Sequence, residues 1–210
     1  VSRRNFVKST ATAVAATSLY NIAGGAHHKT ATVKIALIGC GGRSNRDMPN
    51  FIKACELLGK KAEVVGLADA YQDRLDTAAQ KYGVDKSKCF VGFEAYKQVL
   101  ETDAEFVIMA TPPIFRATHL EAVIKSGKHA MIEKPVAVDA PGCRKVIELG
   151  KKAKNNGLAI VAGVQRRHDI AWLTNKAQID AGAIGKILGG TVSWNGTVPW
   201  IWGREQKMDD

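Results

Sequence analysis

The sequence predicts an α/β protein with a doubly wound parallel sheet, followed by the beginning of a second, α+β domain. Short apolar runs alternate with segments of helical periodicity from about residue 33 to residue 163. The first apolar run ends in a glycine-rich turn, and the alternation stops after residue 163. Alternating strands and helices are joined by right-handed crossovers, which make the strands parallel and place helices on both faces of the sheet.

The individual elements follow from the periodicity of apolar residues. The first predicted strand covers residues 33–38, an apolar run typical of a strand that is buried on both faces. Further strands are predicted over residues 62–68, 106–110, 129–132 and 158–163. Helices are predicted over residues 44–58, 73–82, 93–100, 115–126, 140–155 and 169–181. A strand over residues 187–194 is expected to open the sheet of the second domain.

Composition excludes several classes of function. The 210 residues include 30 Lys and Arg against 20 Asp and Glu, a net charge of +10. These basic residues are spread along the chain and form no basic helix face, so we expect no nucleic-acid partner. The four cysteines form no C-x-x-C pair, which indicates free thiols and no metal site. The apolar run of the first segment is too short to span a bilayer and no later apolar run approaches that length, so stable membrane insertion is not expected.

The first 28 residues are interpreted as a twin-arginine export signal and a linker. Arg3 and Arg4 precede a mild apolar run over residues 11–22 and the small residues at 24–26. The twin-arginine machinery carries folded proteins, so we expect a periplasmic protein that binds its cofactor before export. An amphipathic helix or a disordered tail is the alternative interpretation.

The first predicted strand is followed by a turn made of Gly39, Cys40, Gly41, Gly42, Arg43 and Ser44. This turn matches the G-x-G-x-x-G pattern with Ser44 in the third glycine position. Gly39 permits a tight turn and Gly41 lets the backbone approach a diphosphate, while the N-terminus of the next helix favours the anion. The turn therefore predicts a dinucleotide site.

Asp69 ends the second predicted strand, where a carboxylate accepts hydrogen bonds from the ribose hydroxyls of a dinucleotide. A carboxylate at this place repels the 2′-phosphate of NADP, so NAD is the expected cofactor. NADP is the alternative, because Arg43 and Arg74 lie close enough in the sequence to offset the charge of Asp69 in a folded site. A helix N-cap is the alternative role of Asp69.

Two proline-containing segments follow the next two long strands. The first consists of Ala110, Thr111, Pro112 and Pro113, and the second of Glu133, Lys134 and Pro135. Ligands bind at the carboxyl ends of parallel strands, so both segments are candidate site segments. Proline fixes the local backbone, and the ammonium of Lys134 is suited to orient or polarise a substrate hydroxyl.

The run Ser-Gly-Lys-His-Ala-Met-Ile-Glu-Lys-Pro at residues 126–135, together with the glycine turn, resembles the Gfo/Idh/MocA family of sugar oxidoreductases. The family includes glucose-fructose oxidoreductase, inositol dehydrogenase and rhizopine catabolism proteins, and the resemblance covers about residues 32–195. It implies that Lys134 is catalytic, that Glu133 contacts the cofactor and that residues 110–113 line its path. It also implies that Gln165, Arg166 and His168 face the substrate. The alternative for Lys134 is a surface lysine that ends a strand. The alternative for Gln165, Arg166 and His168 is a solvated, charged strand end.

The chain departs from the family pattern at two places. His and Trp often follow the family's prolines, whereas this chain has Ile114, Phe115 and Arg116, with His119 one turn later. The family also pairs its lysine with an Asp and a His on a later helix, and the sequence shows no such pair. We therefore expect the general base outside this chain.

These observations predict three segments: a signal and linker over residues 1–28, an NAD(P)-binding Rossmann domain over 29–166, and a truncated substrate and oligomerisation domain over 167–210. The predicted function is hydride transfer at a hydroxyl-bearing carbon of a sugar or cyclitol, by a protein that is a homo-oligomer at full length. An NAD-dependent glycoside-cleaving enzyme and a non-catalytic dinucleotide or sugar sensor are the alternatives.

Overall fold

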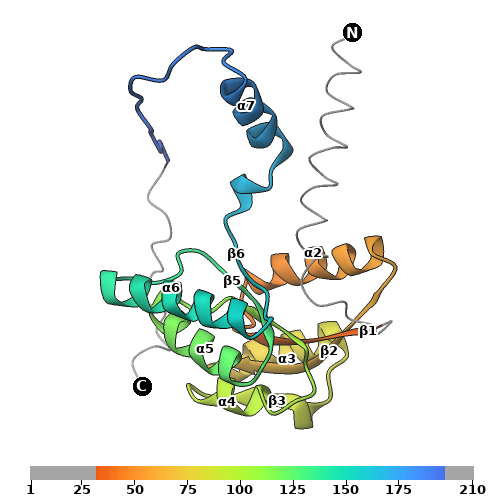
Figure 1. Cartoon of the computed structure of the whole chain (residues 1–210). Helices are drawn as coiled ribbons and strands as arrows, with labels where there is room; N and C mark the ends of the chain where they lie inside the picture. The colour runs from red at the N-terminus through yellow and green to blue at the C-terminus, as the bar shows by residue number, and fades with distance from the viewer. Residues whose placement is uncertain (1–31, 197–210) are drawn as a thin grey trace.

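The computed structural model describes residues 32–196, most of which form a parallel sheet covered by helices (Figure 1). The sheet has six strands in the order β3-β2-β1-β4-β5-β6, and every pair of neighbours is parallel. The strands are β1 Thr32–Ile38, β2 Lys61–Asp69, β3 Cys89–Val91, β4 Phe106–Met109, β5 His129–Ile132 and β6 Ile160–Ala162. The predicted doubly wound parallel sheet is confirmed. Its order reverses between β1 and β4, where such sheets bind ligands.

Helices cover both faces of this sheet and are α2 Ser44–Leu57, α3 Gln72–Tyr82, α4 Ala95–Val99, α5 Pro113–Lys125 and α6 Ala140–Asn155. Strand β1 is buried on both faces because alternate side chains enter different cores. Ile35 and Leu37 pack with residues of α2 and α3. Ala36 and Ile38 pack with residues of α4, α5 and α6 on the other face.

The predicted helices and long strands are present with small shifts at their ends, but two strands were misjudged. The edge strand β3 has only three residues and was missed. The strand predicted over residues 187–194 is wrong, because these residues form no strand in the described chain. Leu188 is 89% exposed and Val192 is fully exposed. A strand needs a partner for its backbone groups, and no described segment pairs with this one.

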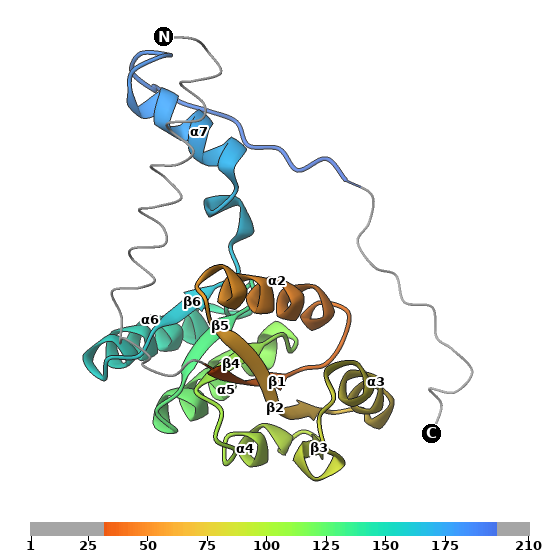
Figure 2. The same cartoon turned by 90° about the vertical axis from the view of Figure 1, so that its right-hand side faces the viewer.

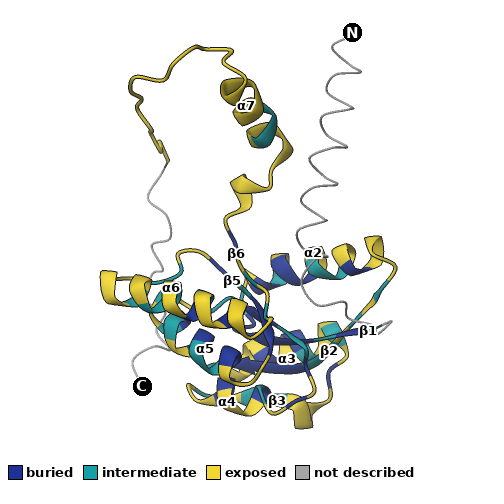
Figure 3. Ribbon diagram, viewed as in Figure 1, coloured by how far each residue is buried: buried dark blue, intermediate teal, exposed yellow. Residues whose placement is uncertain are grey.

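After β6 the chain leaves the sheet through η2 Gln165–Arg167 and continues into α7 Ile170–Asp180. This helix was predicted, and none of its residues is buried. Figures 1 and 2 show α7 projecting away from the sheet, and the colouring of Figure 3 marks most of its residues as exposed.

The predicted export signal over residues 1–28 and the last residues, 197–210, lie outside the described residues. Among the helices that are described, none combines the length and the apolar character needed to cross a membrane. The division at residue 166 stays a prediction.

Candidate functional site

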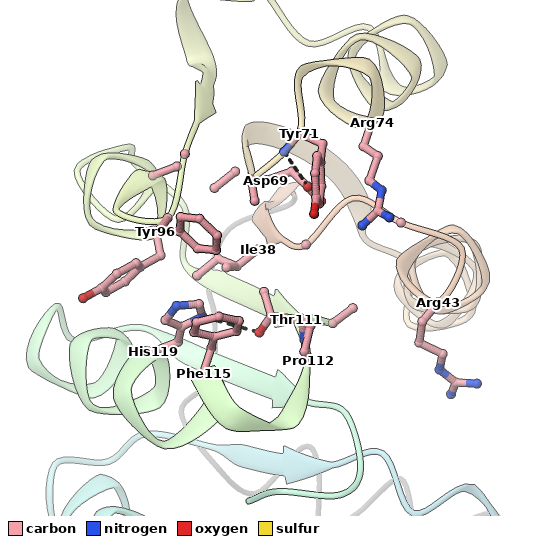
Figure 4. A pocket seen from close by; sticks show the side chains of 18 of the residues that line it. Ile38, Arg43, Asp69, Tyr71, Arg74, Tyr96, Thr111, Pro112, Phe115 and His119 are labelled. Carbon is pink, nitrogen blue, oxygen red and sulfur yellow. Dashed lines mark hydrogen bonds between the residues drawn. The ribbon is translucent and has the colours of Figure 1, made fainter. Parts of the chain in front are cut away.

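A pocket of about 380 Å³ lies at the carboxyl edge of the sheet, at the point where the strand order reverses. Its wall is formed by the glycine turn after β1, the end of β2 with the start of α3, the end of β4, and aromatic side chains near α4 and α5. Figure 4 shows these side chains around Ile38. Of the residues predicted to bind the cofactor, those that line the pocket are Gly39, Gly41, Gly42, Arg43, Asp69, Arg74, Ala110, Thr111 and Pro112.

The glycine turn leaves an open space that fits a diphosphate. Gly39 has a φ of +89°, and a Cβ at this residue would lie 2.9 Å from the backbone nitrogen of Thr111. A Cβ at Gly42 would meet no atom within 4 Å, and one at Gly41 would meet only the Arg74 guanidinium, at 3.6 Å. The buried Ser44 donates a hydrogen bond of 2.8 Å to the Gly41 carbonyl, which holds the turn against the start of α2. An anion is favoured at this helix N-terminus.

Asp69 ties the end of β2 to the glycine turn. Its Oδ2 accepts a hydrogen bond of 2.6 Å from the Cys40 backbone N–H, and its Oδ1 accepts one of 3.0 Å from the Tyr71 N–H. The N-cap of α3 is Tyr71, so the alternative role of Asp69 as the helix cap is wrong. Each carboxylate oxygen still has a lone pair that can accept a hydrogen bond from a ribose hydroxyl.

The two arginines expected near Asp69 differ in their placement. The Arg74 guanidinium lies 4.7 Å from the centre of the Tyr71 ring and close to Gly41, on the Asp69 side of the pocket. Arg43 points away from Asp69 in Figure 4, and its guanidinium pairs with Glu133 and Asp47. Arg74 is therefore the better placed of the two to meet a 2′-phosphate.

An aromatic cluster beside the Thr-Pro-Pro segment completes the pocket. The buried His119 ring lies within hydrogen-bonding distance of Thr111 (Oγ1 to Nδ1, 3.4 Å) and stacks on Tyr96, with ring centres 4.3 Å apart. Phe115 also stacks on His119, with ring centres 5.8 Å apart, and its ring centre lies 6.0 Å from that of Phe93. Phe115 and His119 were noted in the sequence only as departures from the family pattern. Tyr96 and Phe93 were missed, because their helical spacing also fits ordinary core packing.

Burial lowers the pKa of His119 to about 4, so its ring is neutral in the folded protein. An unfolded histidine titrates near its ordinary value of 6.5, so between these values the unfolded chain binds the extra proton. Stability should therefore fall as the pH drops from about 6.5 to about 4, by up to roughly 3 kcal/mol. Urea unfolding across this range measures the effect. His119→Phe keeps the ring stacking and should lose this part of the slope; an unchanged slope would contradict the prediction.

The Glu-Lys-Pro segment lies at the end of β5, next to the pocket. Glu133 is 2% exposed, and its Oε2 accepts a hydrogen bond of 3.0 Å from the Lys134 backbone N–H. The Lys134 side chain is exposed and is not part of the pocket wall. Arg116 is buried between the two proline segments, where it donates hydrogen bonds to the carbonyls of Thr111 and Pro135. Cys40, Ser44 and Pro113 support the turn and helix starts from outside the pocket wall.

The predicted substrate residues are not brought to the pocket. Gln165, Arg166 and His168 are exposed in and after η2, where the chain turns away from the sheet. The Arg166 guanidinium lies 5.0 Å and 4.7 Å from the ring centres of Trp172 and Trp194. Their role toward a substrate stays a prediction.

The comparison with known families agrees with this geometry. Residues 33–161 match the Gfo/Idh/MocA model, described as an oxidoreductase family with an NAD-binding Rossmann fold. The chain belongs to this family. The cofactor of its Rossmann domain is therefore NAD or NADP, as the glycine turn and Asp69 predicted.

The chain is also similar to individual characterised proteins. The chain is 31% identical to inositol 2-dehydrogenase from Salmonella typhimurium over 127 residues, which are 60% of this chain and 36% of that protein. It is 27% identical to a glycosyl hydrolase family 109 protein from Shewanella pealeana over 177 residues, 82% of this chain and 37% of that protein.

Among solved structures, scyllo-inositol dehydrogenase from Lactobacillus casei with bound NAD(H) and scyllo-inositol superposes with a TM-score of 0.61. It is 22% identical and covers 73% of this chain and 42% of that one, a likeness that concerns the fold. The chain spans about two fifths of the length of these relatives.

Proposed function

We propose that this protein is an NAD(P)-dependent oxidoreductase that acts on a hydroxyl-bearing carbon of a sugar or cyclitol. The observation that carries the proposal is the convergence of the glycine turn, Asp69 and Thr111 on one pocket beside the Glu-Lys-Pro segment. The similarity to inositol 2-dehydrogenase supports the substrate class.

In this proposal each segment has a separate task. The open backbone at Gly41 and Gly42 binds the diphosphate, and the carboxylate of Asp69 binds ribose hydroxyls. A bound NAD(P) supplies the hydride acceptor or donor. The Lys134 ammonium donates a hydrogen bond to the substrate oxygen, which orients the hydroxyl-bearing carbon toward the cofactor. We expect the group that accepts the hydroxyl proton to lie on a second domain.

We also propose that the protein is exported to the periplasm by the twin-arginine machinery and forms homo-oligomers at full length. Arg3 and Arg4 before an apolar run support export. The unburied apolar side chains of α7 and the following segment, among them Trp172 and Leu188, are consistent with further contacts made by the second domain.

A glycoside-cleaving activity with bound NAD is the second candidate, because the similarity to the family 109 glycosyl hydrolase spans 82% of the chain. Such an enzyme oxidises its substrate transiently and releases no net NADH. Accumulation of NADH with substrate, followed by absorbance, therefore favours the dehydrogenase, whereas cleavage without net NADH favours the hydrolase.

Calorimetric titration of NAD and NADP into the chain from residue 29 onward, after removal of bound nucleotide, tests the cofactor site. We expect NAD to bind more tightly than NADP because the carboxylate of Asp69 would repel a 2′-phosphate. Gly41→Trp should abolish binding of both, since an indole would fill the space left by the glycine turn. Circular dichroism must show that this variant is folded. Absence of binding to the folded wild-type chain would refute the site.

A further inference from the structure

The Glu-Lys-Pro segment is joined to the glycine turn by a partly buried ion-pair cluster. The Arg43 Nη2 atom lies 2.7 Å from Glu133 Oε1, across 90 residues of sequence, and 3.0 Å from Asp47 Oδ1. The side chains of both acids are 3% exposed, whereas that of Arg43 is 41% exposed. Arg43 therefore forms ion pairs with two buried carboxylates, and the buried Arg116 also interacts electrostatically with one of them, Glu133.

The carboxylate of Glu133 is held in one place from several directions. Its Oε1 binds Arg43, and its Oε2 accepts the hydrogen bond from the Lys134 backbone N–H. At the end of β6, a Cβ on Gly163 would lie only 2.2 Å from Oε1, so this side of the carboxylate has room for no larger residue. The carboxylate of Glu133 thus contacts the backbone from which the Lys134 side chain extends.

Arg43 also belongs to the cofactor site. It follows Gly42 directly, stands at the N-cap of α2 and lines the pocket. Its side chain points away from Asp69 (Figure 4) and contacts Glu133, which follows β5. One residue thus has its backbone in the predicted diphosphate loop and its guanidinium on the acid that precedes Lys134.

We propose that Arg43 is a positioning residue, which holds Glu133 and so couples occupation of the glycine turn to the placement of Lys134. The inference rests on the proposed function. An anion bound at the turn fixes the Arg43 backbone, and the ion pair transmits this constraint to Glu133 and the Lys134 amide. Without Arg43, the two buried acids would repel each other and Glu133 would turn toward water.

Asp47, the second acid of the cluster, provides a control for Glu133. Asp47 shares Arg43 with Glu133 but accepts no hydrogen bond from Lys134, and its buried Oδ2 has no partner among the described residues. Burial raises the pKa of Asp47, with Glu133 acting in the same direction and Arg43 opposing. Asp47→Asn should therefore leave the Arg43 to Glu133 contact in place, whereas Glu133→Gln weakens it without changing the size of the side chain.

The test is NMR of the chain with ¹³C at the lysine Cε, in which the Lys134 signal is assigned by Lys134→Arg. Spectra are recorded with and without saturating NAD, and the NAD Kd is measured separately. We expect NAD to shift the Lys134 signal in the wild type. Arg43→Met should reduce this shift at saturation by at least half, and Arg43→Lys should restore part of it. Glu133→Gln should act like Arg43→Met, and Asp47→Asn like the wild type.

The outcomes separate this inference from the proposed function. A wild-type chain that does not bind NAD overturns both. If NAD binds and shifts the Lys134 signal equally in the wild type and in Arg43→Met, the positioning role alone is overturned. The same holds if NAD binds to the wild type without shifting its Lys134 signal. Equal losses in Asp47→Asn and Glu133→Gln would make the cluster a general support of the fold and also overturn the role. If Arg43→Met does not fold, the positioning role is tested by comparing the NAD-induced Lys134 shift of Glu133→Gln with that of Asp47→Asn.

Discussion

Lys134→Met in the full-length protein is expected to lower turnover of a sugar or cyclitol substrate by about 10²- to 10⁴-fold. Methionine keeps the length of the side chain but removes the ammonium that would hydrogen-bond the substrate oxygen. The Lys134 side chain is exposed beside the pocket wall and not within it. The NAD Kd should therefore change by less than about threefold, and kcat should carry the loss. Steady-state kinetics and a parallel titration of NAD measure the two effects.

Lys151→Met is the matched control for Lys134→Met. Lys151 is an exposed lysine of α6, so its substitution removes the same charge from the protein surface. Its turnover should equal that of the wild type. Undiminished turnover in Lys134→Met would remove Lys134 from the mechanism. Loss of NAD binding together with turnover would instead assign Lys134 to cofactor binding.

Gly39→Ala is expected to reduce the free energy of unfolding by about 3 kcal/mol or more, and to weaken NAD binding with it. Two causes add at this residue. Its φ of +89° is unfavourable for any residue with a Cβ. The added Cβ would also lie 2.9 Å from the Thr111 nitrogen and 3.0 Å from the Ala110 carbonyl carbon. Neither backbone atom can move without displacing the end of β4.

Gly59→Ala separates these two causes. Gly59 has a φ of +68°, and a Cβ there would meet nothing within 4 Å. This variant should lose only the conformational part, about 1–2 kcal/mol. Urea unfolding of both variants gives the comparison. Equal losses would show that β4 yields to the added methyl group, and that the close approach of the turn to Thr111 contributes nothing to stability.

Local patterns in the sequence were sufficient for the sheet and for most of the predicted residues that line the pocket at its carboxyl edge. The alternation of apolar runs and helical segments predicted parallel strands, because a crossover helix between two strands allows no other arrangement. Gly39, Gly41 and Asp69 were found because a diphosphate and a ribose need these residue types at fixed places after strands β1 and β2. Each of these signals lies within a few residues of the element that it predicts.

Contacts between distant segments were decided only by the tertiary structure. The predicted strand over residues 187–194 failed because a strand exists only where another segment pairs with it. The His119 ring, whose neighbours come from α4 and α5, acquired its low pKa from burial between them. Arg43 was expected to lie close enough to Asp69 to offset its charge toward a 2′-phosphate, and its guanidinium instead meets Glu133, 90 residues away. The sequence specifies which residues follow each strand, but only the order of strands in the sheet brings those ends together, and side-chain electrostatics depend on that proximity.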